Sequence, residues 1–347
     1  MEERYFIASN SSEGFCSYYD KTFEIGKFLN LYIIKGGSGT GKAFFMREIA
    51  REAEKRGFEV RYIYCSSDAT SLDAVIIKDL KIAVLDGTAP HIYEAKMVGA
   101  CEVLVDLGAF LNEKMLRSSR NAIENLMLEK QSAFKRVYRN LKAYRAISEN
   151  IEDIIMPAVK IEKIRAYAKR FVRELDFGEG REEHLLTRSI GMRGLNAFDT
   201  YYNNAGVYYE INDYFDTGHI FMREIYSQMS AKRLDLTISN NPIIPARFDA
   251  IAERNTKLTF EIGNEEYADA RQINMKRFID IHKLAKVRKE YRALARLRDD
   301  ILDRALAEFE NVKKYHFVLE QIYGAAMDFD AKEQFTREFC DKIFENN

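Results

Sequence analysis

The sequence predicts an α/β protein with two tandem domains, each built on a parallel sheet and followed by a long helical segment. Apolar runs of strand type alternate with a helix-like stretch over residues 31–86, which is typical of a parallel sheet covered by helices. Short motifs from this region recur in the second half of the 347-residue chain, and helical periodicity follows each copy. The predicted domains are 1–178, with a helical hairpin at about 109–176, and 179–347, with a C-terminal helical segment at about 270–344.

The composition predicts a cytoplasmic protein that does not enter the membrane. A hydrophobic content of 47% is enough for two cores, but no apolar run approaches the roughly 18 residues of a membrane span. The chain starts Met-Glu-Glu-Arg, without the basic and apolar parts of a signal peptide. A net charge of −1 gives no overall attraction to nucleic acid or lipid. The cysteines lack C-x-x-C spacing and are expected to be reduced thiols: Cys16, Cys65, Cys101 and Cys340.

Residues 33–42 read Ile-Ile-Lys-Gly-Gly-Ser-Gly-Thr-Gly-Lys. The pattern G-x-x-x-x-G-K lies between an apolar strand at 31–34 and a predicted helix at 43–56, which is the context of a phosphate-binding loop. Glycines allow successive N–H groups to turn toward an anion, the helix N-terminus adds partial positive charge, and the lysine reaches the β- and γ-phosphates. We therefore expect ATP, or alternatively GTP, to be bound by Gly36, Gly37, Ser38, Gly39, Thr40, Gly41, Lys42, Ala43 and Phe44.

Ala43 departs from this motif. The position after the lysine is usually Ser or Thr, whose hydroxyl binds Mg²⁺, whereas alanine offers only a methyl group. Nucleotide binding does not depend on this hydroxyl, but hydrolysis uses the metal to neutralise charge that develops on the phosphates. The sequence thus predicts nucleotide binding with weakened Mg²⁺ binding.

Asp86 ends the apolar run 81–86, as the acid of a Walker B strand does, and is the candidate ligand for Mg²⁺. The alternative is a strand that ends in a capping aspartate. Asp68, in the loop after the strand at 60–65, is a candidate to orient water, and His91 either faces the γ-phosphate or is a packed loop histidine. The candidate catalytic residues are Lys42, Asp86, Asp68 and His91.

An internal repeat relates the two halves. The motif Phe-Met-Arg-Glu-Ile occurs at 45–49 and again at 221–225. The second copy of the loop, 212–219, keeps neither the glycine pattern nor the lysine, and Asp213 and Asp216 are expected to repel phosphate. Its second strand, 258–262, has no acid at its end. We therefore expect one nucleotide site per chain, with the second half packed against the first as in a pseudo-dimer.

The helical segments contain basic stretches. Nine Lys or Arg lie in 114–145, and nine more lie in 276–298. A solvated helix face, a lid over the nucleotide, and a contact surface for an acidic protein or nucleic acid are the three interpretations of these stretches.

Four motifs together resemble a family of uncharacterised bacterial tandem P-loop ATPase-like proteins. They are Lys-Gly-Gly-Ser-Gly-Thr-Gly-Lys (35–42), Tyr-Cys-Ser-Ser-Asp (64–68), Ser-Leu-Asp-Ala-Val-Ile-Ile (71–77) and Leu-Asp-Gly-Thr-Ala-Pro-His (85–91). The resemblance covers nearly the whole chain and implies two P-loop NTPase-like units. Members of that family usually have Ser-Thr after the loop lysine and a recognisable loop in each half, so this chain departs from them at Ala43 and across 212–219.

Three functions are compatible with these observations. The first is an ATP-binding protein that is a slow ATPase. The second is a non-hydrolysing scaffold that senses a nucleotide, which Ala43 and the altered second loop favour. The third is a phosphotransferase that acts on a small molecule, which the helical segments favour if they act as lids.

Overall fold

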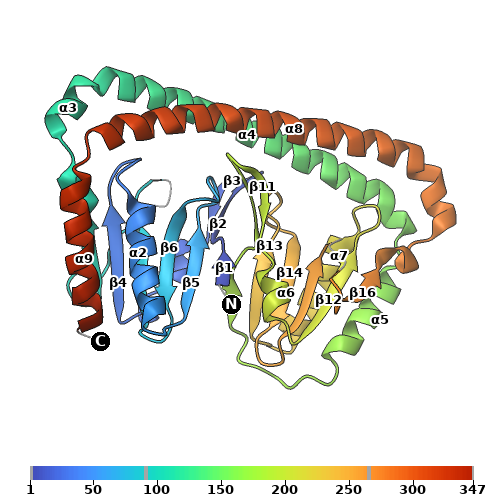
Figure 1. Ribbon diagram of the computed structural model, residues 1–347. Coiled ribbons are helices and arrows are strands. Elements are labelled where there is room, and N and C mark those ends of the chain that lie inside the picture. Colours follow the sequence, from blue (N-terminus) through green and yellow to red (C-terminus); the bar gives the residue numbers. More distant parts are fainter. Residues whose placement is uncertain (1–2, 90–92, 264–266, 346–347) are drawn as a thin grey trace.

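The structure is a computed structural model and describes residues 3–89, 93–263 and 267–345. Two sheets stand side by side, and two long helices run next to each other across one end of both (Figure 1). Each sheet has six strands.

The first half contains, in chain order, β1 (Glu3–Tyr5), β2 (Ala8–Ser11), β3 (Gly14–Ser17), α1 (Tyr19–Thr22), β4 (Asn30–Lys35), α2 (Lys42–Lys55), β5 (Val60–Tyr64), β6 (Leu72–Ile77), β7 (Ile82–Asp86), β8 (Glu102–Asp106), η1 (Leu107–Phe110), α3 (Glu113–Ser118), α4 (Arg120–Ile155), η2 (Met156–Ala158) and α5 (Ile161–Val172). The second half contains β9 (Glu182–His184), β10 (Arg188–Gly191), β11 (Gly194–Ala197), α6 (Thr200–Asn204), β12 (Val207–Asn212), α7 (Gly218–Ala231), β13 (Leu236–Asn240), β14 (Phe248–Glu253), β15 (Leu258–Ile262), β16 (Arg271–Asn274), η3 (Met275–Phe278), α8 (Ile281–Ala325) and α9 (Phe329–Glu345).

The two sheets have the same strand order. The first runs β1-β5-β6-β7-β4-β8, and the second, read in the matching direction, runs β9-β13-β14-β15-β12-β16. In both, the strand before the predicted loop position (β4 or β12) lies between two others. One is the last strand of the sheet, and the other is β7, which ends in the predicted Walker B acid, or its counterpart β15. The prediction of two sheet-bearing α/β halves is confirmed.

The prediction of purely parallel sheets is wrong, because β6 runs antiparallel to both of its neighbours, β5 and β7. The segments 65–71 and 78–81 that flank β6 are too short for a crossover, which takes a dozen or more residues, so the chain turns back as hairpins. The second half does the same with β14. Every residue of β6 is buried.

The helical segments exchange partners between the halves. α4 packs along α8, whereas α5 packs on α7 of the second half and α9 packs on α2 of the first. The hairpin predicted at about 109–176 therefore does not close within the first half. Helical periodicity indicates an apolar face but not which surface covers it. The apolar face of α5, with Ile164, Ala168 and Val172, is buried in the core of the second half.

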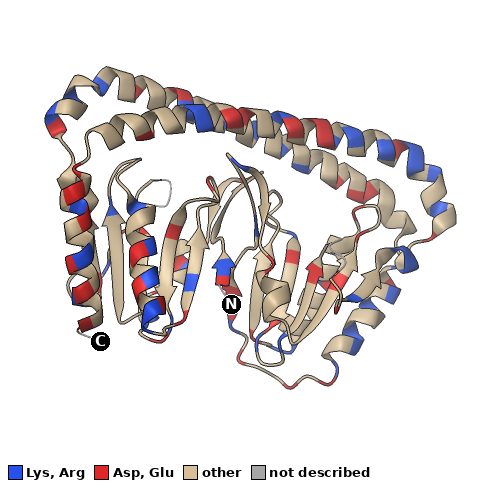
Figure 2. Ribbon diagram, in the orientation of Figure 1, with Lys and Arg blue, Asp and Glu red and all other residues tan. Residues whose placement is uncertain are grey.

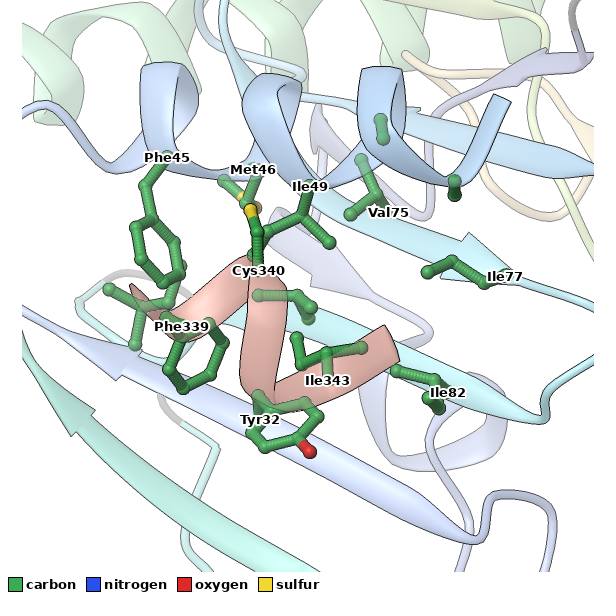
Figure 3. Close-up of a cluster of buried hydrophobic side chains, with 14 of the residues drawn as sticks. Tyr32, Phe45, Met46, Ile49, Val75, Ile77, Ile82, Phe339, Cys340 and Ile343 are labelled. Atoms are coloured by element: carbon green, nitrogen blue, oxygen red, sulfur yellow. The ribbon is translucent and has the colours of Figure 1, made fainter. Parts of the chain in front are cut away.

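α9 completes the core of the first half. Figure 3 shows Phe339 and Ile343 of α9 against α2 and the sheet, next to Phe45 and Tyr32. The rings of Phe45 and Phe339 have their centroids 5.1 Å apart. The last helix of the chain is therefore fixed beside the predicted phosphate loop.

The exchange is reciprocal, and its contacts define matched positions in the two halves. The Asn112 N–H donates to the Ala326 carbonyl, and the Asp280 N–H donates to the Ala158 carbonyl, each at 2.8 Å. The donor Asp280 lies 168 positions after the donor Asn112, and the acceptor Ala326 lies 168 positions after the acceptor Ala158. α5 and α9 begin at residues separated by the same interval.

The halves also meet at their centre. Phe6 and Leu186 exchange both backbone hydrogen bonds, at 2.7 and 2.8 Å. Each half also places the tip of a hairpin against a loop of the other: Ser12 N–H donates to Ile243 O, and Met192 N–H donates to Ser67 O. The second half thus reaches the loop edge of the first sheet.

Basic and acidic side chains are interspersed along α4 and α8 (Figure 2). Some join the helices, as in the ion pair of 2.9 Å between Arg136 Nε and Glu308 Oε2. Within the described ranges, no helix has the length and apolarity that crossing a bilayer would require.

Candidate functional site

The predicted loop, residues 36–41, connects β4 to α2 at the edge of the first sheet where β4 ends. Gly39 and Gly41 have φ angles of +75° and +79°, a backbone region that side chains other than glycine rarely adopt. The buried Thr40 hydroxyl donates to the Gly37 carbonyl at 3.0 Å and closes the turn. Glycine is thus required at the two positions where the loop bends into the helix.

Lys42, the first residue of α2, folds back over the loop. Its Nζ donates to the carbonyls of Gly36 at 3.2 Å and Gly37 at 2.8 Å, and lies 3.6 Å from Oδ2 of Asp86. The structure therefore brings together the loop, its lysine and the predicted Walker B acid.

Asp86 is buried at the end of β7. Its Oδ1 accepts a hydrogen bond of 2.9 Å from the Thr88 N–H, so Oδ2 is directed to the lysine. A second carboxyl group lies near it. The antiparallel ladder pairs Ala74 with Leu85, Asp73 and Asp86 are the next residues on the two strands, and the charge of Asp86 acts on Asp73. Sequence reasoning did not select Asp73, because a β6 antiparallel to β7 was not predicted.

The environment of Asp73 is unfavourable for a charged group. Burial raises the pKa of Asp73 well above its usual range, and the neighbouring charge of Asp86 raises it further, while the ammonium of Lys42 acts in the opposite direction. Two adjacent buried carboxylates next to a lysine form an arrangement that a cation would stabilise.

α8 covers the outer side of the loop. A Cβ placed on Gly37 would lie 3.0 Å from the Tyr323 ring, and one placed on Gly39 would lie 2.6 Å from the Glu320 carbonyl oxygen. His316 Nδ1 lies 3.4 Å from Ser38 Oγ. The glycines thus allow the loop to pass directly beneath the helix.

α4 contributes a cation to the same region. Lys130 Nζ lies 3.0 Å from His316 Nδ1. Burial lowers the pKa of Lys130, and the positive charge of Lys42 contributes to this shift, while Glu320 opposes it. Lys130 of α4 and Lys42 of α2 therefore both bring positive charge to the region of the loop.

Ala43 and Phe44 follow the lysine on α2. The side chain of Ala43 packs against the core of the first half. Phe44 is 43% exposed, and the ammonium of Lys332 on α9 lies 4.3 Å from the centroid of its ring. Lys332 itself was not predicted as a site residue.

Asp68 has a different environment from the other predicted site residues. It accepts hydrogen bonds from Thr70 and from Nε of Arg193, the latter at 3.1 Å, where the second half meets the first. Burial raises the pKa of Asp68, but the hydrogen bonds from Thr70 and Arg193 outweigh this and lower it overall. His91 lies outside the described residues.

In the second half, the side chain of Asp213 caps the N-terminus of α7, the helix that matches α2. Asp213 directly follows β12, and its Oδ1 accepts hydrogen bonds from the N–H groups of Tyr214, Thr217 and Gly218 at 2.7, 2.8 and 2.7 Å. Thr217 and Gly218 match Gly41 and Lys42, the N-terminus of α2. A carboxylate thus occupies the place at which the first half was predicted to bind phosphate.

Cations from α8 and from the loop before β14 pair with an acid of this second loop. Asp216 pairs with Arg298 of α8 at 3.0 Å and with Arg247 at 3.2 Å. Arg298 lies 168 positions after Lys130 and is its counterpart on α8. The counterpart of Asp86 in the second half is Ile262. The counterpart of Asp73 is Asp249, whose carboxylate lies 3.7 Å from Nη1 of Arg188.

Among the residues that the structure describes, no group of three or more His, Cys, Asp or Glu side chains has the arrangement of a metal site. Asp73, Lys130 and Lys332 lie near the loop but were not predicted as site residues. Of these, Lys332 could have been noticed in the sequence, because its spacing puts a charged residue on the same helix face as Phe339 and Ile343.

Comparison with known proteins adds no assignment. No family model matches the chain, and neither a curated protein nor a solved structure matches it.

Proposed function

We propose that the first half binds one nucleoside triphosphate, with ATP the favoured ligand, at the loop 36–42. The contrast between the two helix N-termini carries this proposal. At α7, the N–H groups of Thr217 and Gly218 are saturated by the carboxylate of Asp213. At α2, the matching N–H groups of Gly41 and Lys42 donate to no acceptor within the described ranges.

An anion is the natural partner of such a terminus. The first N–H groups of a helix lack intrahelical acceptors and carry partial positive charge, so they favour phosphate. Lys42 adds a full positive charge; its present hydrogen-bond acceptors are the neutral carbonyls of Gly36 and Gly37, and its ion-pair partner is Asp86 at 3.6 Å. A phosphate would replace these by charge-assisted hydrogen bonds, which are stronger.

The carboxylates fit Mg²⁺ that arrives with the nucleotide. Mg²⁺ is usually held by one or two carboxylates, phosphate oxygens and waters, and Asp86 and Asp73 are near enough for the charge of one to act on the other. Bound Mg²⁺ would neutralise charge on the phosphates. Ala43 removes the usual hydroxyl ligand, so the metal contribution depends on these two acids.

The test is a calorimetric titration of ATP, ADP and GTP, with and without Mg²⁺. We expect ATP to bind and Lys42→Ala to weaken binding by about 100-fold, since contacts to a charged group contribute about 1.5–3 kcal/mol each. Lys55→Ala, at the exposed end of α2, is the control and should bind as the parent does. Absence of binding to the parent, or equal binding by Lys42→Ala, would contradict the proposal.

Hydrolysis is tested separately with Ala43→Ser. Serine is small enough for the partly buried position of Ala43 and restores the hydroxyl ligand. Phosphate release that rises in this variant supports a slow ATPase. Release that stays at background while ATP still binds supports the nucleotide-sensing scaffold, and a phosphorylated product in an acceptor screen would support a phosphotransferase.

A further inference from the structure

We infer that Lys332 of α9 is a second phosphate-binding lysine of the first-half site. This inference rests on the proposed function and extends it, because it assigns part of the nucleotide site to the last helix of the chain. Lys332 lies 290 positions after Lys42 and outside the loop motif.

The position of its ammonium is the first observation. A Cβ placed on Gly41 would lie 2.9 Å from Lys332 Nζ, so the charge is held directly against the residue that caps α2. The side chain reaches this point because α9 packs on α2 through Phe339 and Ile343. A bulkier residue at Gly41 would close this approach.

The second observation is that this position is energetically unfavourable for the charged ammonium group of Lys332. Lys332 is 2% exposed, and its ammonium makes no hydrogen bond or ion pair with any residue of 3–89, 93–263 or 267–345. Burial lowers the pKa of Lys332, as expected for a cation removed from water. The N-terminus of α2 is also the positive end of a helix, which disfavours a cation. The ring of Phe44 offsets only part of this.

The second half supplies the matched comparison. The residue 168 positions before Lys332 is Ile164 of α5, which is fully buried in the second core. The two segments are otherwise alike, since Phe171 of α5 matches Phe339 of α9, and Leu175, which follows α5, matches Ile343. The half that closes its loop with Asp213 has an apolar side chain here, whereas the half with the glycine loop has a lysine.

A bound polyphosphate would offset both the burial of the unpaired ammonium group and its proximity to the positive end of α2. Its oxygens would accept from the Lys332 ammonium and from the N–H groups of α2 together, which pairs the buried cation and reverses the unfavourable charge at the helix end. In the second half, a cation from a neighbouring helix already pairs with an anion of the loop: Arg298 of α8 lies 3.0 Å from Asp216. In the first half, the anion would come from the ligand.

The experiment compares Lys332→Ile with the parent by titration of ATP and of inorganic tripolyphosphate without metal. The matched residue Ile164 shows that isoleucine is accepted at this place in the fold, so we expect the variant to fold with an unchanged or higher melting temperature. We expect its affinity for both ligands to fall by about tenfold or more, with a weaker salt dependence. Arg337→Ala, which removes an exposed cation of the same helix, should bind as the parent does.

The outcomes separate this inference from the proposed function. If the parent binds both ligands and Lys332→Ile binds them equally well, the inference is wrong and the proposed function stands. If the parent binds neither ligand, both are wrong. If affinity falls only together with the melting temperature, and Lys332→Arg does not recover binding, Lys332 has a structural role and the inference is again overturned.

Discussion

The N-terminus of α7 is closed by the carboxylate of Asp213, whereas that of α2 lies among glycines, Lys42 and the buried Lys332 of α9. The two halves share a strand order and differ in which charges surround this one bend of backbone. The second half carries its anion within the chain and is complete without a ligand. The first half has the cations but lacks an acid within the loop, and this difference is the basis of the proposed nucleotide site.

The largest expected effect comes from giving the first loop an aspartate like Asp213 of the second loop. Gly36 directly follows β4, as Asp213 follows β12, and a Cβ at Gly36 would lie 2.8 Å from Thr40 Oγ1. In the double variant Gly36→Asp/Thr40→Ala, the new carboxylate should take the N–H groups of α2 and repel phosphate. We expect ATP affinity to fall at least about 100-fold, or about 3 kcal/mol, by calorimetry. The single variant Thr40→Ala is the control, and a double variant that binds like it would contradict the comparison.

Removing the carboxylate from the second loop should lower the free energy of unfolding and leave ATP binding unchanged. Asp213→Ala leaves three N–H groups without their acceptor, and loss of such a cap costs about 1–2 kcal/mol of unfolding free energy. Denaturant unfolding measures this loss. ATP affinity should stay unchanged, because the second half has no lysine at Gly218; a change in affinity would show that the two loops are coupled.

Asp86→Asn tests the metal half of the comparison. The second half has Ile262 at this position. We expect the gain in ATP affinity on adding Mg²⁺, about tenfold, to disappear, since Mg²⁺ requires carboxylate and phosphate oxygens together. Binding without metal should be retained, because the variant removes a negative charge from the site. A Mg²⁺ effect of unchanged size would remove Asp86 from the proposed site.

The smallest effect concerns pH. The hydrogen bond from His219 and the charges of Arg247 and Arg223 lower the pKa of Glu152 to about 2, against the effect of burial. An acid whose pKa is lower in the folded state contributes stability that is present above its ordinary pKa of 4.5 and is lost as pH falls toward 2. We expect the unfolding free energy to fall more steeply over this range in the parent than in Glu152→Gln. Parallel curves would contradict this.

Local sequence patterns were sufficient for the parts of the fold that lie close together in the chain. The order strand, glycine loop and helix around Lys42 was predictable, and so was the loss of that pattern at 212–219. Asp86 was predicted at the end of a buried strand, and the structure has it at the end of β7, which pairs with β4. These predictions depend on periods of two and 3.6 residues and on turn chemistry, which act over a few residues.

The pairing of distant segments was not predictable in the same way. An apolar face on α5 indicates that something covers it, but the choice between the first and second core depends on the whole topology. For the same reason, Lys332 was not assigned to a loop 290 positions earlier. Asp73 was missed because its relation to Asp86 needs the antiparallel direction of β6, which follows from the length of two short connections.

The most direct test is the number of nucleotides bound per chain, measured by equilibrium dialysis of ATP against the full chain at saturating Mg²⁺. One ATP per chain, abolished by Lys42→Ala and unaffected by Asp213→Ala, is the result expected if α2 binds a ligand where α7 binds its own carboxylate. No bound ATP, or two per chain, would contradict this account of the two halves.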